Sequence, residues 1–96
     1  MSEKETIQQH LKIIGRVQGV GFRHFTRQQA NAIGIKGWVR NIPECSVEVF
    51  ISGNENQIDE MKRRLYKGPI SAKVERIDEV QFESSVSEYV DFKVLR

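Results

Sequence analysis

The sequence predicts an α+β fold in which two helices cover one face of an antiparallel sheet. Apolar residues alternate along several segments and recur at helical spacing along two others, and glycine or turn residues separate most of them. The resulting order is β-α-β-β-α-β, followed by a short terminal strand. This order is that of the ferredoxin-like split β-α-β arrangement.

The first two elements expected are a strand over residues 7–17 and a helix over residues 22–33. Apolar residues of the first segment fall mostly on odd positions, which is the period of a half-buried strand. In the second segment they recur every three or four residues, as on one face of a helix. Gly34 predicts a left-handed cap that ends this helix.

A hairpin is expected next, from strands over residues 35–41 and 46–52. The second of these strands alternates clearly, and Gly53 is predicted to end it. A second helix then begins after Asn54 or Asn56, because either side chain can cap it. Its predicted buried stripe and its end are given by Ile58, Met61, Leu65 and the pair Gly68-Pro69.

The last elements expected are a strand over residues 73–82, a polar loop over 83–88 and a short strand that contains Val90, Phe92 and Val94. The first of these has an irregular pattern because Ile77 is out of phase with its apolar neighbours. We therefore expect either a bulge or a partly exposed strand there.

Length and composition predict one domain over residues 6–96, after a frayed tail at residues 1–5. The net charge of +2 is too small to argue for nucleic acid or an anionic membrane as a partner. No apolar run has the length of a transmembrane helix, and the start of the chain is polar, so we expect a cytoplasmic protein. The single cysteine and two distant histidines show no metal-ligand spacing, and nothing requires more than a monomer.

The run from Gly15 to Arg23 carries most of the chemistry that the sequence suggests. It joins the first strand to the first helix and contains three glycines. Such a loop can direct several backbone N–H groups toward one point, and the start of a helix adds partial positive charge there. Arg23 adds a permanent cation, which the helix disfavours at this end unless an anion offsets it. The run predicts a phosphate pocket, and a flexible turn is the simpler alternative.

Asn41 is the second candidate site residue, at the end of the strand expected over residues 35–41. Its amide can donate to one oxygen and accept from another, so it can hold a water molecule beside a phosphate. The alternative is a turn-favouring asparagine shortly before Pro43. Trp38 on the same strand is expected to serve packing rather than ligand binding.

Two of these segments together resemble the signatures of the acylphosphatase family. Residues 15–23 resemble the first signature, and the run Gly-Trp-Val-Arg-Asn at residues 37–41 resembles the second. Residues 46–49 and the pair Gly68-Pro69 also fall where the family has similar residues. The resemblance extends from about Ile7 to the C-terminus.

The resemblance implies an enzyme that hydrolyses acyl phosphates to a carboxylate and inorganic phosphate, with no metal and no organic cofactor. By position, it makes Arg23 the phosphate-binding residue and Asn41 the residue that orients the attacking water. It also implies a backbone cradle for phosphate, formed by Val17, Gln18, Gly19, Val20, Gly21 and Phe22. This agrees with the chemistry, because the carboxylate is a good leaving group and positioning with charge stabilisation can suffice.

The chain departs from the family in the hairpin turn, where relatives often have Asp-Gly and this sequence has Glu44-Cys45. A residue other than glycine there predicts a different turn type or a change in stability. We interpret Cys45 as a thiol at the tip of a turn, because no histidine lies near it in sequence to activate it. We interpret His24 as a surface or supporting residue and not as a general base.

Two other functions are compatible with the same fold. Residues 36–39 weakly resemble an RNA-binding consensus, with Phe50 as a possible stacking residue, but the aromatic residues that would complete that consensus are missing. The other is a regulatory domain that binds phosphate through Arg23 without turnover. Binding to single-stranded RNA or survival of an acyl phosphate would distinguish these functions from the enzyme.

Overall fold

The computed structural model describes residues 6–81 and 89–95. The predicted tail at residues 1–5 and the predicted loop at 83–88 lie outside the described residues. The elements follow the predicted order, with small shifts at their ends. They are β1 (Ile7–Arg16), α1 (Phe22–Ile33), β2 (Lys36–Asn41), β3 (Val47–Gly53), α2 (Glu55–Lys67), β4 (Lys73–Val80) and β5 (Phe92–Val94).

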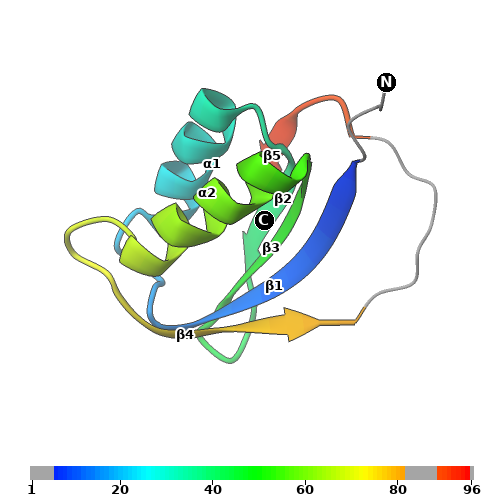
Figure 1. The fold of residues 1–96 in the computed structure, drawn as a ribbon. Helices are drawn as coiled ribbons and strands as arrows, with labels where there is room; N and C mark the ends of the chain where they lie inside the picture. Colours follow the sequence, from blue (N-terminus) through cyan, green and yellow to red (C-terminus); the bar gives the residue numbers. More distant parts are fainter. Residues whose placement is uncertain (1–5, 82–88, 96) are drawn as a thin grey trace, which may run out of the picture.

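The five strands form one sheet in the order β4-β1-β3-β2-β5 (Figure 1). The first four pair antiparallel, which confirms the split β-α-β arrangement. β5 pairs with β2 in parallel, so the sheet is mixed and the prediction of an antiparallel sheet is corrected at its last strand. β4 runs opposite to β2, and the chain then turns back, so β5 runs opposite to β4 and in the same direction as β2.

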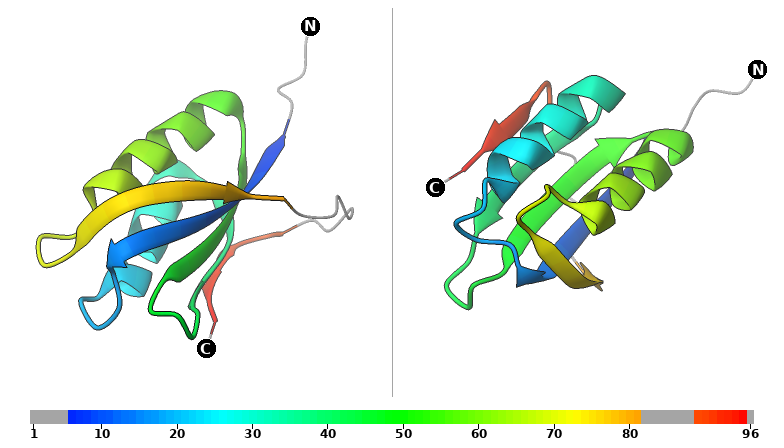
Figure 2. Two further views of the ribbon diagram at one scale, coloured as in Figure 1. Left: turned by 90° about the horizontal axis from the view of Figure 1, so that it is seen from below. Right: turned by 90° about the vertical axis from the view of Figure 1, so that its left-hand side faces the viewer.

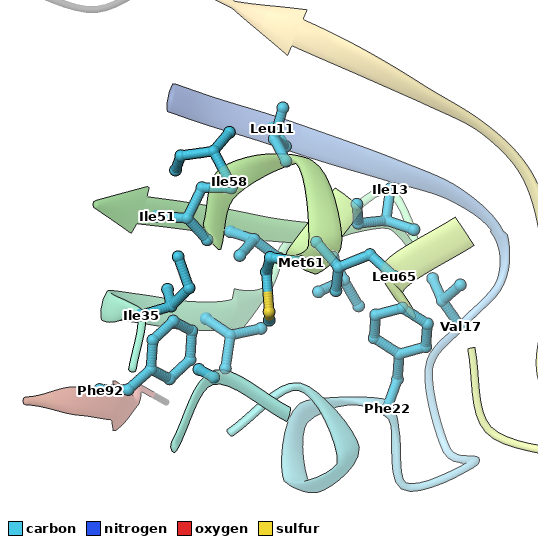
Figure 3. Close-up of a cluster of buried hydrophobic side chains, with 14 residues drawn as sticks. Leu11, Ile13, Val17, Phe22, Ile35, Ile51, Ile58, Met61, Leu65 and Phe92 are labelled. Carbon is cyan, nitrogen blue, oxygen red and sulfur yellow. The ribbon is translucent and has the colours of Figure 1, made fainter. Parts of the chain in front are cut away.

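Both helices cover the same face of the sheet, as Figure 1 and the two further views in Figure 2 show. The apolar core lies between the helices and the strands (Figure 3). The stripe predicted for the second helix is buried in this core. Fully buried members of the core from the sheet and from α2 are Leu11, Ile13, Val39, Val47, Val49, Ile51, Met61 and Leu65.

The start of α2 is closed by reciprocal hydrogen bonds, and Asn54 is the cap among the two predicted. Its side-chain oxygen accepts from the backbone N–H of Gln57 at 2.9 Å, and the side chain of Gln57 accepts from the N–H of Asn54 at 2.8 Å. This capping box satisfies two backbone donors that a helix otherwise leaves unpaired.

The irregular phase predicted for the fourth strand has two causes in the structure. β4 is an edge strand with much of its length exposed, and its register with β1 shifts between Ile14 and Gly15. Both of the expected explanations, a bulge and partial exposure, therefore apply.

Aromatic side chains pack on the sheet face opposite the helices. Trp38 and Phe50 are paired across β2 and β3, and their rings stack with centroids 5.9 Å apart. His10 on β1 contacts both rings edge-on. The guanidinium carbon of Arg40 lies 5.3 Å from the centre of the Trp38 ring. Trp38 thus has the packing role that the sequence analysis expected.

Candidate active site

Three strands of the sheet end on the same side, at their carboxyl ends. β1 and β2 each pair antiparallel with β3, and β5 is parallel to β2, so these three strands run in the same direction. Their carboxyl ends lie together with the start of α1, and a cavity of about 480 Å³ opens there. It is lined by Val17, Gly19, Gly21, Phe22, Arg23, His24, Arg27, Asn41 and Val94.

The loop that opens the cavity depends on two glycines with left-handed backbone. Gly19 has φ 73° and Gly21 has φ 77°. A Cβ atom at either position would meet no atom within 4 Å, so the conformation and not the available space requires glycine. Of the predicted cradle at residues 17–22, all but Gln18 and Val20 line the cavity.

The first turn of α1 begins without a side-chain cap. Gly21 is the N-cap residue, no side chain in the described part of the chain caps the backbone donors there, and the first turn contains no acidic residue. The leading N–H groups of a helix have no partner within the helix. In α1 these donors and the positive end of the helix are thus left at the cavity, where they can bind an anion.

Arg23 is held by a hydrogen bond to the backbone that follows β5. Its Nη1 donates to the backbone carbonyl oxygen of Leu95 at 3.3 Å, just beyond the end of β5. This bond uses one of the five N–H donors of the guanidinium. The side chain is half-buried, so it is held at the cavity while most of its donors stay available to a ligand.

Asn41 carries a buried acceptor without a partner. Its side-chain Oδ1 is buried and accepts no hydrogen bond from any residue that the structure describes. The residue also lines the cavity. A buried polar atom of this kind costs free energy unless a donor such as water reaches it. In this conformation Oδ1 has almost no surface open to the cavity, so a rotation of the amide is needed to bring it to a water molecule there.

Gln18 ties the loop to the hairpin that carries Asn41. Its side-chain Nε2 donates to the backbone carbonyl oxygens of Ile42 at 2.8 Å and Ser46 at 2.9 Å. The side chain of Gln18 therefore ties the first segment that resembled a family signature to the turn that directly follows the second.

Three residues that line the cavity were not among the predicted site residues. His24 and Arg27 follow Arg23 on α1, and Val94 comes from β5. The spacing of four residues between the two arginines was a signal for Arg27, because such residues share a helix face. Val94 had no local signal, since only the parallel pairing of β5 brings it to the cavity.

The hairpin turn keeps a left-handed residue although it has no glycine. Cys45 has φ 69°, and it is exposed and does not line the cavity. The backbone N–H of Cys45 donates to the carbonyl oxygen of Ile42 at 3.1 Å, and that of Ile42 donates to Ser46 at 3.0 Å. The departure from Asp-Gly thus places a side chain in a conformation that favours glycine.

The described residues contain neither a cluster of metal ligands nor a helix that could span a membrane. In residues 6–81 and 89–95, no three His, Cys, Asp or Glu side chains are grouped as a metal ion would need. Neither helix in that part of the chain has the length and apolar character to cross a bilayer.

These features define a small ferredoxin-like α+β domain with a cationic cavity where three strands end. The family model for acylphosphatase matches residues 9–94. The chain is 48% identical over 68 residues to an acylphosphatase of Paraburkholderia xenovorans, covering 71% of this chain and 70% of that protein. It is 40% identical over 84 residues to an acylphosphatase of Acaryochloris marina, covering 88% of each. The crystal structure of the Bacillus subtilis acylphosphatase is similar, with a TM-score of 0.86 and 29% identity, over 96% of this chain and all of that one. The chain belongs to the acylphosphatase family.

Proposed function

We propose that this chain hydrolyses the carboxyl–phosphate bond of acyl phosphates, with Arg23 and the loop at residues 17–22 holding the phosphoryl group and Asn41 orienting water. Membership of the family supports the reaction. One observation carries the assignment of the residues. One cavity is lined by an uncapped helix start, by the guanidinium of Arg23 and by Asn41, whose buried amide oxygen has no partner among the described residues.

The phosphoryl oxygens are bound by the N–H groups at the start of α1 and by the free donors of Arg23. Both groups are in place before substrate arrives, because the loop is tied by Gln18 and the guanidinium by Leu95. Donors fixed in advance stabilise the charge of the transition state without reorganising during the reaction. A bound anion also offsets the unfavourable position of Arg23 in the first turn of the helix.

Once the Asn41 amide has rotated so that Oδ1 faces the cavity, the attacking water donates one hydrogen bond to it, which directs an oxygen lone pair toward the phosphorus atom. A bond forms between the water oxygen and phosphorus while the bond from phosphorus to the acyl oxygen breaks. The departing group keeps that electron pair and leaves as a carboxylate, which needs no general acid because it is a weak base. The proton of the water passes to a phosphate oxygen of the substrate, which gives inorganic phosphate.

The test is hydrolysis of benzoyl phosphate in EDTA by the wild type and by Arg23→Gln, Asn41→Ala and a control, Arg63→Gln. Arg63 is an exposed arginine on α2, away from the cavity. Removing the charged donors of Arg23 is expected to weaken phosphate binding by about 10- to 100-fold, from the strength of charge-assisted hydrogen bonds. Asn41→Ala is expected to lower kcat while phosphate affinity stays close to that of the wild type.

The assay separates the proposal from its alternatives. Normal turnover by folded Arg23→Gln would refute the assignment of the phosphate site. A folded wild type that binds phosphate but leaves benzoyl phosphate intact would instead be a regulatory domain. Phe50 gives the RNA-binding alternative little support. Its ring is stacked on Trp38 and the residue is only 7% exposed, so little of it is open to a base.

We also propose that residues 6–96 form one monomeric unit that acts in the cytoplasm on a small-molecule substrate, without nucleic acid or membrane partners. The proposed chemistry uses the loop at residues 17–22, Arg23 and Asn41 of one chain and asks for no residue from a second copy, which is why we propose a monomer. The exposed thiol of Cys45 suits a reducing compartment. Sedimentation equilibrium tests the first point, because a dimer at working concentrations would contradict it. Cell fractionation tests the second.

A further inference from the structure

The cavity contains a second cation that hydrolysis of the phosphoryl group alone does not use. Arg27 lines it together with Arg23. We propose that Arg27 binds an anionic group on the acyl part of the substrate, so that the enzyme favours acyl phosphates whose acyl group carries a carboxylate or a second phosphate. This inference rests on the proposed function, because it assumes that the phosphoryl group lies at Arg23.

The helix sets the distance between the two cations. Arg23 and Arg27 are four residues apart on α1, so their Cβ atoms are about 5–6 Å apart on one face of the helix. Arg23 lies in the first turn, where the phosphoryl group is bound. Arg27 is one turn further along the helix, and it is exposed. An acyl group that extends from the bound phosphoryl group along α1 would therefore approach Arg27.

The charge of Arg27 is available to a ligand. No described residue forms an ion pair or hydrogen bond with it, whereas Arg23 is anchored by the carbonyl oxygen of Leu95. Among the described residues that line the cavity there is no Asp or Glu. Two arginines four residues apart repel one another. A substrate with an anionic group at each end would relieve that repulsion, and a substrate with a neutral acyl group would relieve only the part at Arg23.

The experiment compares benzoyl phosphates that carry a carboxylate at position 3 or 4 with the corresponding carboxamides. Each pair has nearly the same shape and differs by one negative charge at neutral pH. The quantity measured is the ratio of kcat/KM for the carboxylate to kcat/KM for the carboxamide. This ratio does not depend on how much of a preparation is active. The proteins are the wild type, Arg27→Gln, Arg27→Glu and the matched control Arg63→Gln, another exposed helical arginine.

We expect Arg27→Gln to lower the ratio about fivefold for at least one carboxylate position, the upper end of the contribution of an exposed ion pair. Arg27→Glu should lower it further, and Arg63→Gln should keep the wild-type ratio. In 1 M NaCl the wild-type ratio should fall toward that of Arg27→Gln, because salt screens exposed charges.

An unchanged ratio in both Arg27 variants at both positions would overturn the inference. If kcat/KM itself falls equally for carboxylate and carboxamide while the ratio stays the same, Arg27 acts on the phosphoryl group instead. A wild type that hydrolyses neither compound nor benzoyl phosphate would instead refute the proposed function.

Discussion

Replacing Cys45 by glycine is expected to stabilise the protein. Cys45 holds φ 69° at the hairpin turn, in the left-handed region where a side chain costs about 1–2 kcal/mol. Glycine removes that cost but is more flexible in the unfolded chain, which returns about 0.5–1 kcal/mol. Because the residue is exposed, no buried contact is lost. The net expectation is a free energy of unfolding higher by about 0.5–1 kcal/mol, which for a domain of this size raises Tm by about 4 °C.

Urea denaturation followed by circular dichroism measures this change, with Cys45→Ala as the control. Alanine removes the thiol but keeps the Cβ atom that the backbone conformation disfavours, so its free energy of unfolding should stay close to that of the wild type. Hydrolysis by both variants should be retained, because Cys45 does not line the cavity. Equal stabilisation by alanine and glycine would refute the conformational argument, and loss of hydrolysis in Cys45→Ala would point to chemistry at the thiol.

Three further predictions concern other parts of the chain. Burial raises the pKa of Glu48, but hydrogen bonds from Arg40 and His10 outweigh this effect and lower the pKa below its ordinary value of 4.5. The ionised carboxylate therefore stabilises the fold above pH 4.5, and this contribution is lost as the pH falls through the lower pKa of the folded state. Acid denaturation of Glu48→Gln should therefore show a shallower loss of stability below pH 4.5 than the wild type, and parallel curves would contradict this. Gln18→Met should lower kcat/KM for benzoyl phosphate by up to about 30-fold, because two hydrogen bonds of about 1 kcal/mol each no longer tie the loop to the hairpin. Unchanged kinetics would show that the loop is fixed without them. Asn54→Ala should lower the free energy of unfolding by about 1 kcal/mol while hydrolysis by the folded enzyme is retained, because it removes only the cap of α2, and a matching loss of kcat would show coupling between the cap and the site.

Local pattern was sufficient for the existence and order of the elements but not for all of their ends. Gly53 was predicted to end the third strand, yet it pairs with Ile7 and belongs to β3. The preference of one glycine is weaker than pairing with a neighbouring strand. Val90 continues the alternation of Phe92 but is 81% exposed and lies before β5. A short apolar alternation does not reveal which of its residues find a partner strand.

The candidate site divides in the same way between local and distant information. The sequence revealed the loop glycines and Arg23, because glycines that permit left-handed backbone and a cation at a helix start stand within a few residues of one another. The anchoring of Arg23 by Leu95 was not, since it depends on the parallel pairing of β5 with β2. The bond between Gln18 and the hairpin was also not apparent, because the sequence placed Gln18 in the cradle without indicating where its side chain points.

The two helices of this chain begin in opposite ways. The start of α2 is built for stability, and the start of α1 is built to bind a ligand. α2 has a full capping box, an acidic first turn with Glu55, and basic residues in its last turn, all of which suit the helix dipole. α1 has none of these features, and Arg23 stands where the dipole disfavours a cation. The same sequence thus satisfies the rules of helix capping at one helix and breaks them at the other, at the cavity. Departures from local rules concentrate where a ligand completes the structure. An anion bound at the start of α1 would pair the backbone donors that the fold itself leaves unpaired. Phosphate binding should therefore stabilise α1.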